Sequence, residues 1–133
     1  MLHSVSLRDH ILPNPVKVRA NANIADAMHI IIDNKVSGLC VVDEADNLVG
    51  ILSELDCLRA VLSATYNKTN IGEVREYMAS DNLVVAHPDE DIIDVAQDML
   101  TKNKRRRPVV ENGKLIGQIT CRQLLAAVSK FRG

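Results

Sequence analysis

Aromatic residues are nearly missing from this chain. Its 133 residues include two tyrosines, one phenylalanine and no tryptophan, so aromatics make up 2% of the sequence. Because proteins that bind single-stranded nucleic acid commonly stack the bases on aromatic side chains, this binding mode is largely excluded. Hydrophobic residues still account for 47% of the chain. We therefore expect a core built from aliphatic side chains and methionine.

Long apolar runs and paired cysteines are missing as well. No stretch approaches the roughly twenty apolar residues that cross a bilayer, and charged residues interrupt the N-terminus, so a signal peptide is not indicated. We expect a soluble, cytoplasmic protein without a membrane partner. Cys40, Cys57 and Cys121 are widely spaced and form no CxxC pair. This spacing indicates neither a disulfide framework nor a metal site, and we expect three buried thiols.

Neither sign of charge is in excess. The chain has 16 Lys and Arg against 17 Asp and Glu, which gives a net charge of -1. The chain as a whole therefore does not attract nucleic acid or anionic membranes, and any such binding would depend on a local patch. A length of 133 residues suits one compact domain, or two small halves that share a core.

An internal repeat is the main positive feature of the sequence. The stretch 48–56 recurs as 115–123, and the corresponding pairs are Gly50 and Gly117, Ser53 and Thr120, and Asp56 and Gln123. Two similar halves in one chain imply a pseudo-twofold axis with equivalent clefts beside it. Neither half is large enough to bury its apolar faces well alone, so we expect the halves to pack on each other.

Both halves predict the same order of elements. Apolar residues at helical spacing predict helices that begin after Asn23 and at Ile92, and short apolar runs predict strands. We expect strands over 16–18, 39–42 and 48–52, and again over 83–85, 109–110 and 115–119. We expect further helices within 1–15, where Val5, Leu7, Ile11 and Leu12 precede Pro13, from Ser53, over 71–78, and from Thr120. The predicted division is 1–64, a linker at 65–70, and 71–133.

The two halves resemble the CBS domain, which is named after cystathionine β-synthase. The resemblance rests on 36–43 (VSGLCVVD) with 50–56 (GILSELD), and on 105–111 (RRRPVVE) with 117–123 (GQITCRQ). Over 16–129 the chain is similar to one stand-alone tandem pair, a Bateman module. The resemblance implies an α/β (α+β) fold of two β-α-β-β-α repeats packed about a pseudo-twofold axis. It also implies a non-catalytic, homodimeric sensor of adenosine-containing compounds.

The resemblance also implies a set of site residues. Asp56 would bind the ribose hydroxyls, Ser53 would lie near the phosphate, and Arg105 and Arg106 would reach the phosphate across the cleft. The adenine side would be bordered by Ile51, Asn82, Leu83 and Lys104. The second cleft would use Val16, Val36, Ser37, Ile119, Thr120 and Gln123. A carboxylate accepts charge-assisted bonds from a diol and an amide does not, so we expect the cleft with Asp56 to bind better.

Each of these residues has a plainer interpretation. Ser53-x-x-Asp56 and Thr120-x-x-Gln123 both fit capping boxes, in which the side chains only satisfy the start of a helix. The basic run 102–107 fits a solvated turn at a helix end. Two residues depart from the family pattern: Cys40 replaces a proline and is expected to be a small buried hydrophobe, and Arg107 replaces an aliphatic residue. We expect Arg107 to place charge at a cleft rim or a dimer interface.

Three functions follow from the sequence, in order of preference. The first is a regulatory module that senses AMP, ADP, ATP or another adenosine derivative, requires no cofactor, and passes its occupancy to a partner protein or to its own dimer by a conformational shift. The second is a structural or dimerisation module whose clefts hold no ligand. The third is nucleic-acid binding through Lys102 to Arg107, which the near-neutral charge and the missing aromatics make the least favoured.

Overall fold

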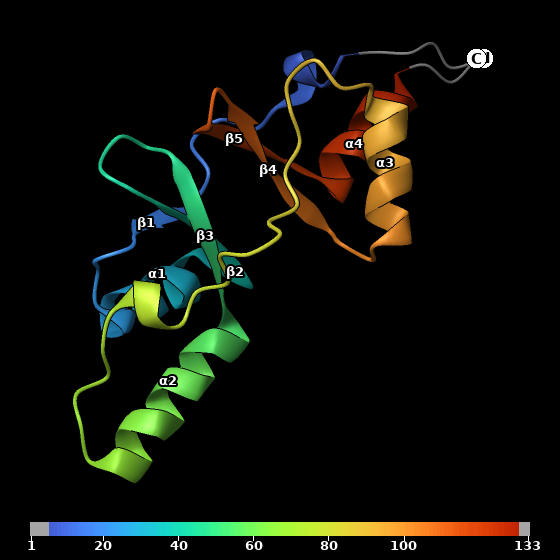
Figure 1. Cartoon of the computed structure of the whole chain (residues 1–133). Helices are drawn as coiled ribbons and strands as arrows, with labels where there is room; N and C mark the ends of the chain where they lie inside the picture. The colour runs from blue at the N-terminus through green and yellow to red at the C-terminus, as the bar shows by residue number, and fades with distance from the viewer. Residues whose placement is uncertain (1–5, 131–133) are drawn as a thin grey trace. The chain divides into compact units, whose positions relative to one another are not determined.

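The computed structural model describes residues 6–130, which form two compact units. The central unit is Val16–Leu83. The terminal unit combines the described residues before Val16 with those from Val84 onward. Each unit has helices against a small sheet, so the expected α/β class is confirmed (Figure 1). Over residues 6–130, none of the helices has the length and apolar character that a membrane span requires.

The central unit contains a three-stranded sheet with two helices. Strand β1 (Lys17–Arg19) pairs in parallel with β2 (Gly38–Val42), which pairs antiparallel with β3 (Leu48–Ser53). Helix α1 (Ile24–Asn34) buries its apolar face of Ile24, Ala27 and Ile31, and its cap Asn23 accepts a hydrogen bond from the backbone N–H of Ala25. The predicted cap is therefore confirmed, and so is the predicted apolar face except for Ile32, which is 65% exposed.

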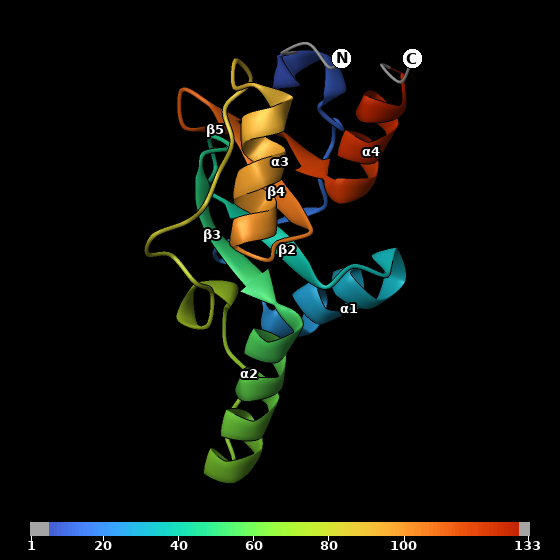
Figure 2. The same ribbon diagram turned by 90° about the vertical axis from the view of Figure 1, so that its right-hand side faces the viewer.

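Helix α2 (Glu54–Asn67) follows directly from β3 and projects away from the sheet of its unit (Figures 1 and 2). The helix ends where Lys68 adopts a left-handed conformation with φ of 55°. Since the helix continues to Asn67, the first half of the linker predicted at 65–70 is helical. A 3-10 turn, η2 (Val74–Glu76), follows. The helix predicted over 71–78 is thus wrong, because one short turn replaces it.

The terminal unit is built around an antiparallel hairpin. Strands β4 (Arg106–Glu111) and β5 (Lys114–Thr120) pair across a turn in which Asn112 and Gly113 both have positive φ, as tight hairpins favour. Helices α3 (Ile92–Thr101) and α4 (Cys121–Ser129) contact each other (Figure 2). A 3-10 turn, η1 (Leu7–His10), replaces the helix expected within 1–15 and buries Leu7 in this unit. Val5 lies outside the described residues.

Two prolines prevent the strand predicted over 83–85. In the central unit, the ladder beside β2 uses the N–H groups of Cys40 and Ala20, which donate to Val16 O and Val42 O. The equivalent positions in the terminal unit are Pro108 and Pro88, which have no N–H to donate. Only a single bridge between Ala86 and Val109 remains there. The pairing in the terminal unit therefore keeps the register of the central unit, but it is shorter because the two prolines lack backbone N–H donors.

The first segment of each repeat packs in the unit formed mainly by the other repeat. Ala79 exchanges backbone hydrogen bonds of 2.9 Å with Ile51 of β3, and Leu12 bonds in the same way with Gln118 of β5, at 2.9 and 3.0 Å. The compact units consequently do not coincide with the predicted division at 65–70. Residues 71–83 complete the central unit, and residues 6–15 complete the terminal one.

Gly50 and Gly117 recur because these crossing segments come very close. A Cβ atom on Gly50 would lie 2.9 Å from the carbonyl oxygen of Ala79, and one on Gly117 would lie 2.6 Å from that of Leu12. Both oxygens belong to backbone that is fixed by the hydrogen bonds beside it. The repeated glycine therefore allows the pairing of the crossing segments.

Substitution of Gly50 by alanine should destabilise the central unit. The new methyl group has to push back the segment carrying Ala79, and such overpacking typically destabilises by about 1–3 kcal/mol. The free energy of unfolding, measured by urea denaturation, should fall by that amount in Gly50→Ala and similarly in Gly117→Ala. An unchanged midpoint in both variants would show that the crossing segments are not held against the strands.

Candidate ligand-binding site

A reciprocal capping box joins the end of β3 to the start of α2. The hydroxyl oxygen of Ser53 accepts from the backbone N–H of Asp56 at 3.1 Å, and Oδ2 of Asp56 accepts from the backbone N–H of Ser53 at 2.8 Å. The Asp56 side chain is only 8% exposed. The plainer interpretation of Ser53-x-x-Asp56 is therefore realised in the structure, and it fixes the orientation of the carboxylate.

The second carboxylate oxygen of Asp56 is paired with Arg59. A guanidinium Nη2 of Arg59 donates to Oδ1 of Asp56, one helical turn earlier on α2. The sequence analysis missed Arg59, although an acid and a base three residues apart on a helix is a known pairing signal. The carboxylate is thus held by the cap on one oxygen and by a cation on the other.

Capping does not exhaust the capacity of Asp56 to accept hydrogen bonds. An ionised carboxylate offers about four lone-pair sites, and the structure fills one on each oxygen, from Ser53 and from Arg59. One further acceptor site on each oxygen is compatible with two neighbouring hydroxyl groups. The capping function and the predicted ribose contact can therefore coexist in the same side chain.

Three of the residues predicted for the adenine side belong to the central unit with Asp56. Ile51 is half-buried on β3, and its backbone is paired with Ala79, which brings the segment leading to Asn82 and Leu83 alongside this strand. Asn82 is exposed in a left-handed conformation with φ of 55°, and Leu83 is half-buried. The central unit therefore contains Ser53, Asp56, Ile51, Asn82 and Leu83 of the predicted set.

The equivalent capping box in the terminal unit is uncharged, and the side-chain amide of Gln123 is already hydrogen-bonded within the unit. Oε1 of Gln123 accepts from the backbone N–H of Thr120 at 2.9 Å, and Nε2 donates to the carbonyl oxygen of His10 at 3.2 Å. The position equivalent to Arg59 is Ala126. This site thus lacks both charges of the Asp56 site, and the amide donor of Gln123 is engaged by the crossing segment.

Ile119 was wrongly predicted to line the second cleft. Its side chain is fully buried in the core of the terminal unit. Side chains alternate across a strand, and the residue that corresponds to Ile51 in the repeat is Gln118, which is half-buried. The prediction was off by one position, which on a strand moves a side chain to the opposite face.

The predicted phosphate contacts Arg105 and Arg106 belong to the terminal unit, as does Lys104, and all three are exposed. Arg106 lies opposite Thr120 across the hairpin, and the carbonyl oxygen of Arg105 accepts from the backbone N–H of Cys121 at 2.9 Å. Within their unit they are therefore neighbours of the Thr120 box. The basic run is a solvated surface from Lys102 to Arg106.

Arg107 is not at a rim or an exposed interface, contrary to expectation. It is 3% exposed, and its Nη2 lies 2.7 Å from Oδ2 of Asp98 on α3. Nε and Nη2 are both buried without a hydrogen-bond partner, so the contact of Nη2 with Asp98 is an ion pair. The alternation along β4 turns Arg107 inward beneath α3, while Arg106 faces solvent. Asp98 therefore supplies the counter-charge for a buried cation.

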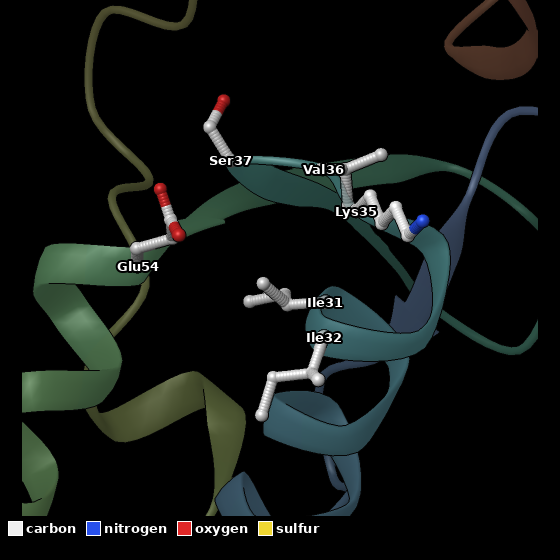
Figure 3. A pocket seen from close by; sticks show the side chains of 6 residues that line it. All are labelled: Ile31, Ile32, Lys35, Val36, Ser37 and Glu54. Carbon is white, nitrogen blue, oxygen red and sulfur yellow. The ribbon is translucent and has the colours of Figure 1, made fainter.

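Two predicted second-cleft residues, Val36 and Ser37, line a shallow pocket of about 380 Å³ in the central unit. In Figure 3, Ile31 and Ile32 extend from α1 toward the start of α2, where Glu54 lies, and Lys35 and Val36 close the other end. Val16 is half-buried immediately before β1 and does not line this pocket. Of the predicted residues, the pocket gathers Val36 and Ser37 and leaves out Ser53 and Asp56.

The cysteines divide into two environments. Cys40 and Cys57 are buried as expected, and burial together with the charges of Asp56 and Glu54 raises the pKa of the Cys57 thiol. Cys121 is exposed at the start of α4, so the expectation of a third buried thiol is wrong. Across residues 6–130, no group of three or more His, Cys, Asp or Glu side chains is arranged to hold a metal ion.

Comparison of the sequence with known protein families identifies the family to which the two repeats belong. The family model of the CBS domain matches residues 7–63 and again residues 73–130. The chain belongs to the CBS domain family. The two matches together cover most of the chain, and they follow the sequence repeat, whereas the compact units exchange their first segments.

Solved CBS structures resemble the chain over nearly its whole length. CBSX2 of Arabidopsis thaliana in complex with AMP is 30% identical, has a TM-score of 0.80, and is matched over 94% of this chain and 96% of that one. The CBS domain pair of protein MJ0100 in complex with 5′-methylthioadenosine and S-adenosyl-L-methionine is 27% identical, with a TM-score of 0.74 over 98% and 100% of the two chains. CBS pairs of this fold thus bind adenosine compounds of different charge.

Curated relatives are longer proteins. An uncharacterised protein of Methanocaldococcus jannaschii, MJ1225, is 32% identical over 86% of this chain and 39% of its own length. Inosine-5′-monophosphate dehydrogenase of Aquifex aeolicus is 35% identical over 84% of this chain and 22% of its own length. The chain therefore spans well under half of these relatives.

The ion pair beneath α3 should make stability depend on pH. The cationic side chains of Lys102 and then Arg107, both paired with Asp98, lower the pKa of its carboxyl from the ordinary value of 3.8. Because the pKa is depressed in the folded state, the stabilisation is present above the ordinary value and is lost as the pH falls through the folded one. In urea denaturation, Asp98→Asn should be less stable than wild type at pH 7, and the difference should shrink below about pH 4. A difference that is constant with pH would contradict this assignment.

Proposed function

We propose that this CBS domain pair is a regulatory module that binds an adenosine-derived ligand through Asp56. The observation that carries the proposal is the buried carboxylate of Asp56 at the start of α2, oriented by its capping bonds, in a fold that matches the AMP complex of CBSX2. A ligand with a ribose diol suits this carboxylate. The proposed ligands are AMP, ADP, ATP or another adenosine derivative.

The chemistry favours the Asp56 site over the Gln123 site. Hydrogen bonds to a charged acceptor contribute about 1.5–3 kcal/mol each, against about 0.5–1.5 kcal/mol for neutral pairs. Asp56 offers a negative carboxylate, whereas Gln123 offers one amide oxygen that already accepts from Thr120. We therefore propose that the chain binds its ligand more tightly through Asp56.

Each unit, taken by itself, presents groups that suit phosphate oxygens. The start of α2 at Ser53 presents backbone N–H groups and the positive end of a helix dipole. The guanidinium groups of Arg105 and Arg106 are exposed and suit phosphate oxygens. Their contact with the same ligand stays a prediction from the family resemblance.

We propose regulation as the role of binding, and not catalysis. A ligand that binds one arrangement of the two repeats better than another shifts the population toward that arrangement. The element that responds to ligand binding is a partner protein, a further part of a longer chain, or a second copy of this module. A cytoplasmic location fits a nucleotide sensor and remains a proposal.

An apolar stripe on α2 supports association with a second copy. Leu55, Leu58, Leu62 and Tyr66 are 55–82% exposed and recur at the spacing of one helix face. Two copies of such a stripe can cover each other across a twofold axis, as homodimers commonly do. We therefore propose a homodimer that uses the projecting face of α2.

The ribose assignment predicts discrimination against 2′-deoxy ligands. Wild type should bind AMP at least about tenfold more tightly than 2′-deoxy-AMP, because the lost hydroxyl leaves one acceptor of Asp56 unused. In Asp56→Asn, which keeps an acceptor for the cap, that ratio should fall toward one. Isothermal titration calorimetry measures both affinities, and Gln123→Ala is the control that should keep the ratio. Equal ratios in wild type and Asp56→Asn would refute the ribose contact of Asp56, and no binding at all would favour the ligand-free alternative.

The dimer proposal predicts that charge on the α2 stripe separates the copies. Leu58→Glu with Leu62→Glu should convert a dimer to a monomer, as measured by light scattering after size exclusion, because four buried carboxylates would face each other in the dimer. Asn67→Glu, also exposed on α2 but on another helix face, is the matched control and should stay dimeric. A wild type that is monomeric at high concentration would refute the proposal.

A further inference from the structure

Arg59 covers the side of Asp56 that the capping box leaves open. The Asp56 side chain is 8% exposed, and its Oδ1 is paired with Nη2 of Arg59, whose own side chain is 63% exposed. Any ligand that reaches this carboxylate therefore meets the guanidinium group at the same place. Arg59 lies close enough to the proposed ribose contact to influence which ligands bind.

The charge of Arg59 affects how the site interacts with a phosphate-bearing ligand. A buried carboxylate without a partner would repel a ligand that carries phosphate, since like charges in a poorly solvated place interact strongly. Arg59 offsets this charge. In the terminal unit both charges are absent, because Gln123 replaces the acid and Ala126 occupies the position of Arg59. In these two boxes, acid and base occur together or are absent together.

We propose that Arg59 determines the class of ligand at Asp56 by making the site favour anionic adenosine compounds over neutral ones. This inference rests on the proposed function. With Arg59 in place, the carboxylate can hold the ribose diol without repelling a 5′-phosphate. Without it, the unpaired negative charge of Asp56 favours a neutral or cationic adenosine compound. AMP and 5′-methylthioadenosine share the adenine and the ribose diol, but carry a phosphate and a neutral methylthio group, respectively, at the 5′ position, so they are the natural pair of probes.

The chain offers matched variants for this test. Arg59→Gln removes the charge and keeps a hydrogen-bond donor, while Arg59→Lys keeps the charge. Arg75 is a suitable control because it is also 63% exposed, belongs to the same unit, and pairs with an acid, Glu73, at 2.7 Å. Since both arginines project into solvent, all three variants should fold, which thermal denaturation checks.

Calorimetric titration of each full-length variant with the two probes gives the selectivity as a ratio of dissociation constants. Wild type should favour AMP, and Arg59→Gln should lose about tenfold of that preference, or about 1.4 kcal/mol. Arg59→Lys should retain most of it, and Arg75→Gln all of it.

The outcomes separate this inference from the proposed function. If wild type binds neither probe, the proposed function fails and the inference with it. If wild type binds and Arg59→Gln changes both affinities by the same factor, Asp56 can remain the ribose contact but Arg59 does not select the ligand. A loss of preference in Arg75→Gln equal to that in Arg59→Gln would also overturn the inference, because it would reflect the general charge of the unit.

Discussion

The backbone pairing of Ala79 with Ile51, and of Leu12 with Gln118, is the constraint on which the arrangement of this chain depends. Each pairing adds a segment of one repeat to the hairpin of the other. It requires glycine at positions 50 and 117, because a side chain there would meet the backbone of the crossing segment. The same pairing brings the segment with Asn82 toward β3, and the carbonyl oxygen of His10 to Gln123. The local environment of both capping boxes thus depends on it.

The two capping boxes share the same backbone geometry but differ in charge. Both boxes place an oxygen of the third helical residue on the backbone N–H of the cap. Only in the central unit is that residue an acid, and there a guanidinium group balances it. A repeated backbone with unequal charges explains how one chain can carry two similar places of very different chemistry. It also separates the structural part of the motif, which both repeats share, from the part that would recognise a ligand.

Much of the fold could be predicted from the sequence, because its signals are local. The caps Asn23 and Ser53, the apolar spacing of α1 and α3, and the Asn112-Gly113 turn depend on a few neighbouring residues. The exchange of segments could not be predicted in this way, since no local pattern says which hairpin a segment joins. The shortened strand near Ala86 depends on Pro88 and Pro108, whose effect becomes visible only when the strands are aligned.

The candidate site was predictable to a similar degree. Ser53 and Asp56 stood out by motif, but Arg59 required attention to a second residue on the same helix turn. Ile119 was misplaced because the repeat was aligned one position out of register. Arg107 was misjudged because its partner Asp98 lies on a different element, α3, and not on the same strand. Residue type and spacing identify a motif and a charge partner on the same helix, such as Arg59, whereas the pairing of Arg107 with Asp98 comes from tertiary structure.

The crossing of the two first segments has a consequence for ancestry. A forerunner that encoded a single repeat would have had a hairpin whose outer edge was met by the first segment of another molecule. Such a forerunner would have assembled by reciprocal exchange between two chains before any gene duplication. Fusion into one polypeptide would make the exchange internal and leave the two copies free to differ, as Asp56 and Gln123 do.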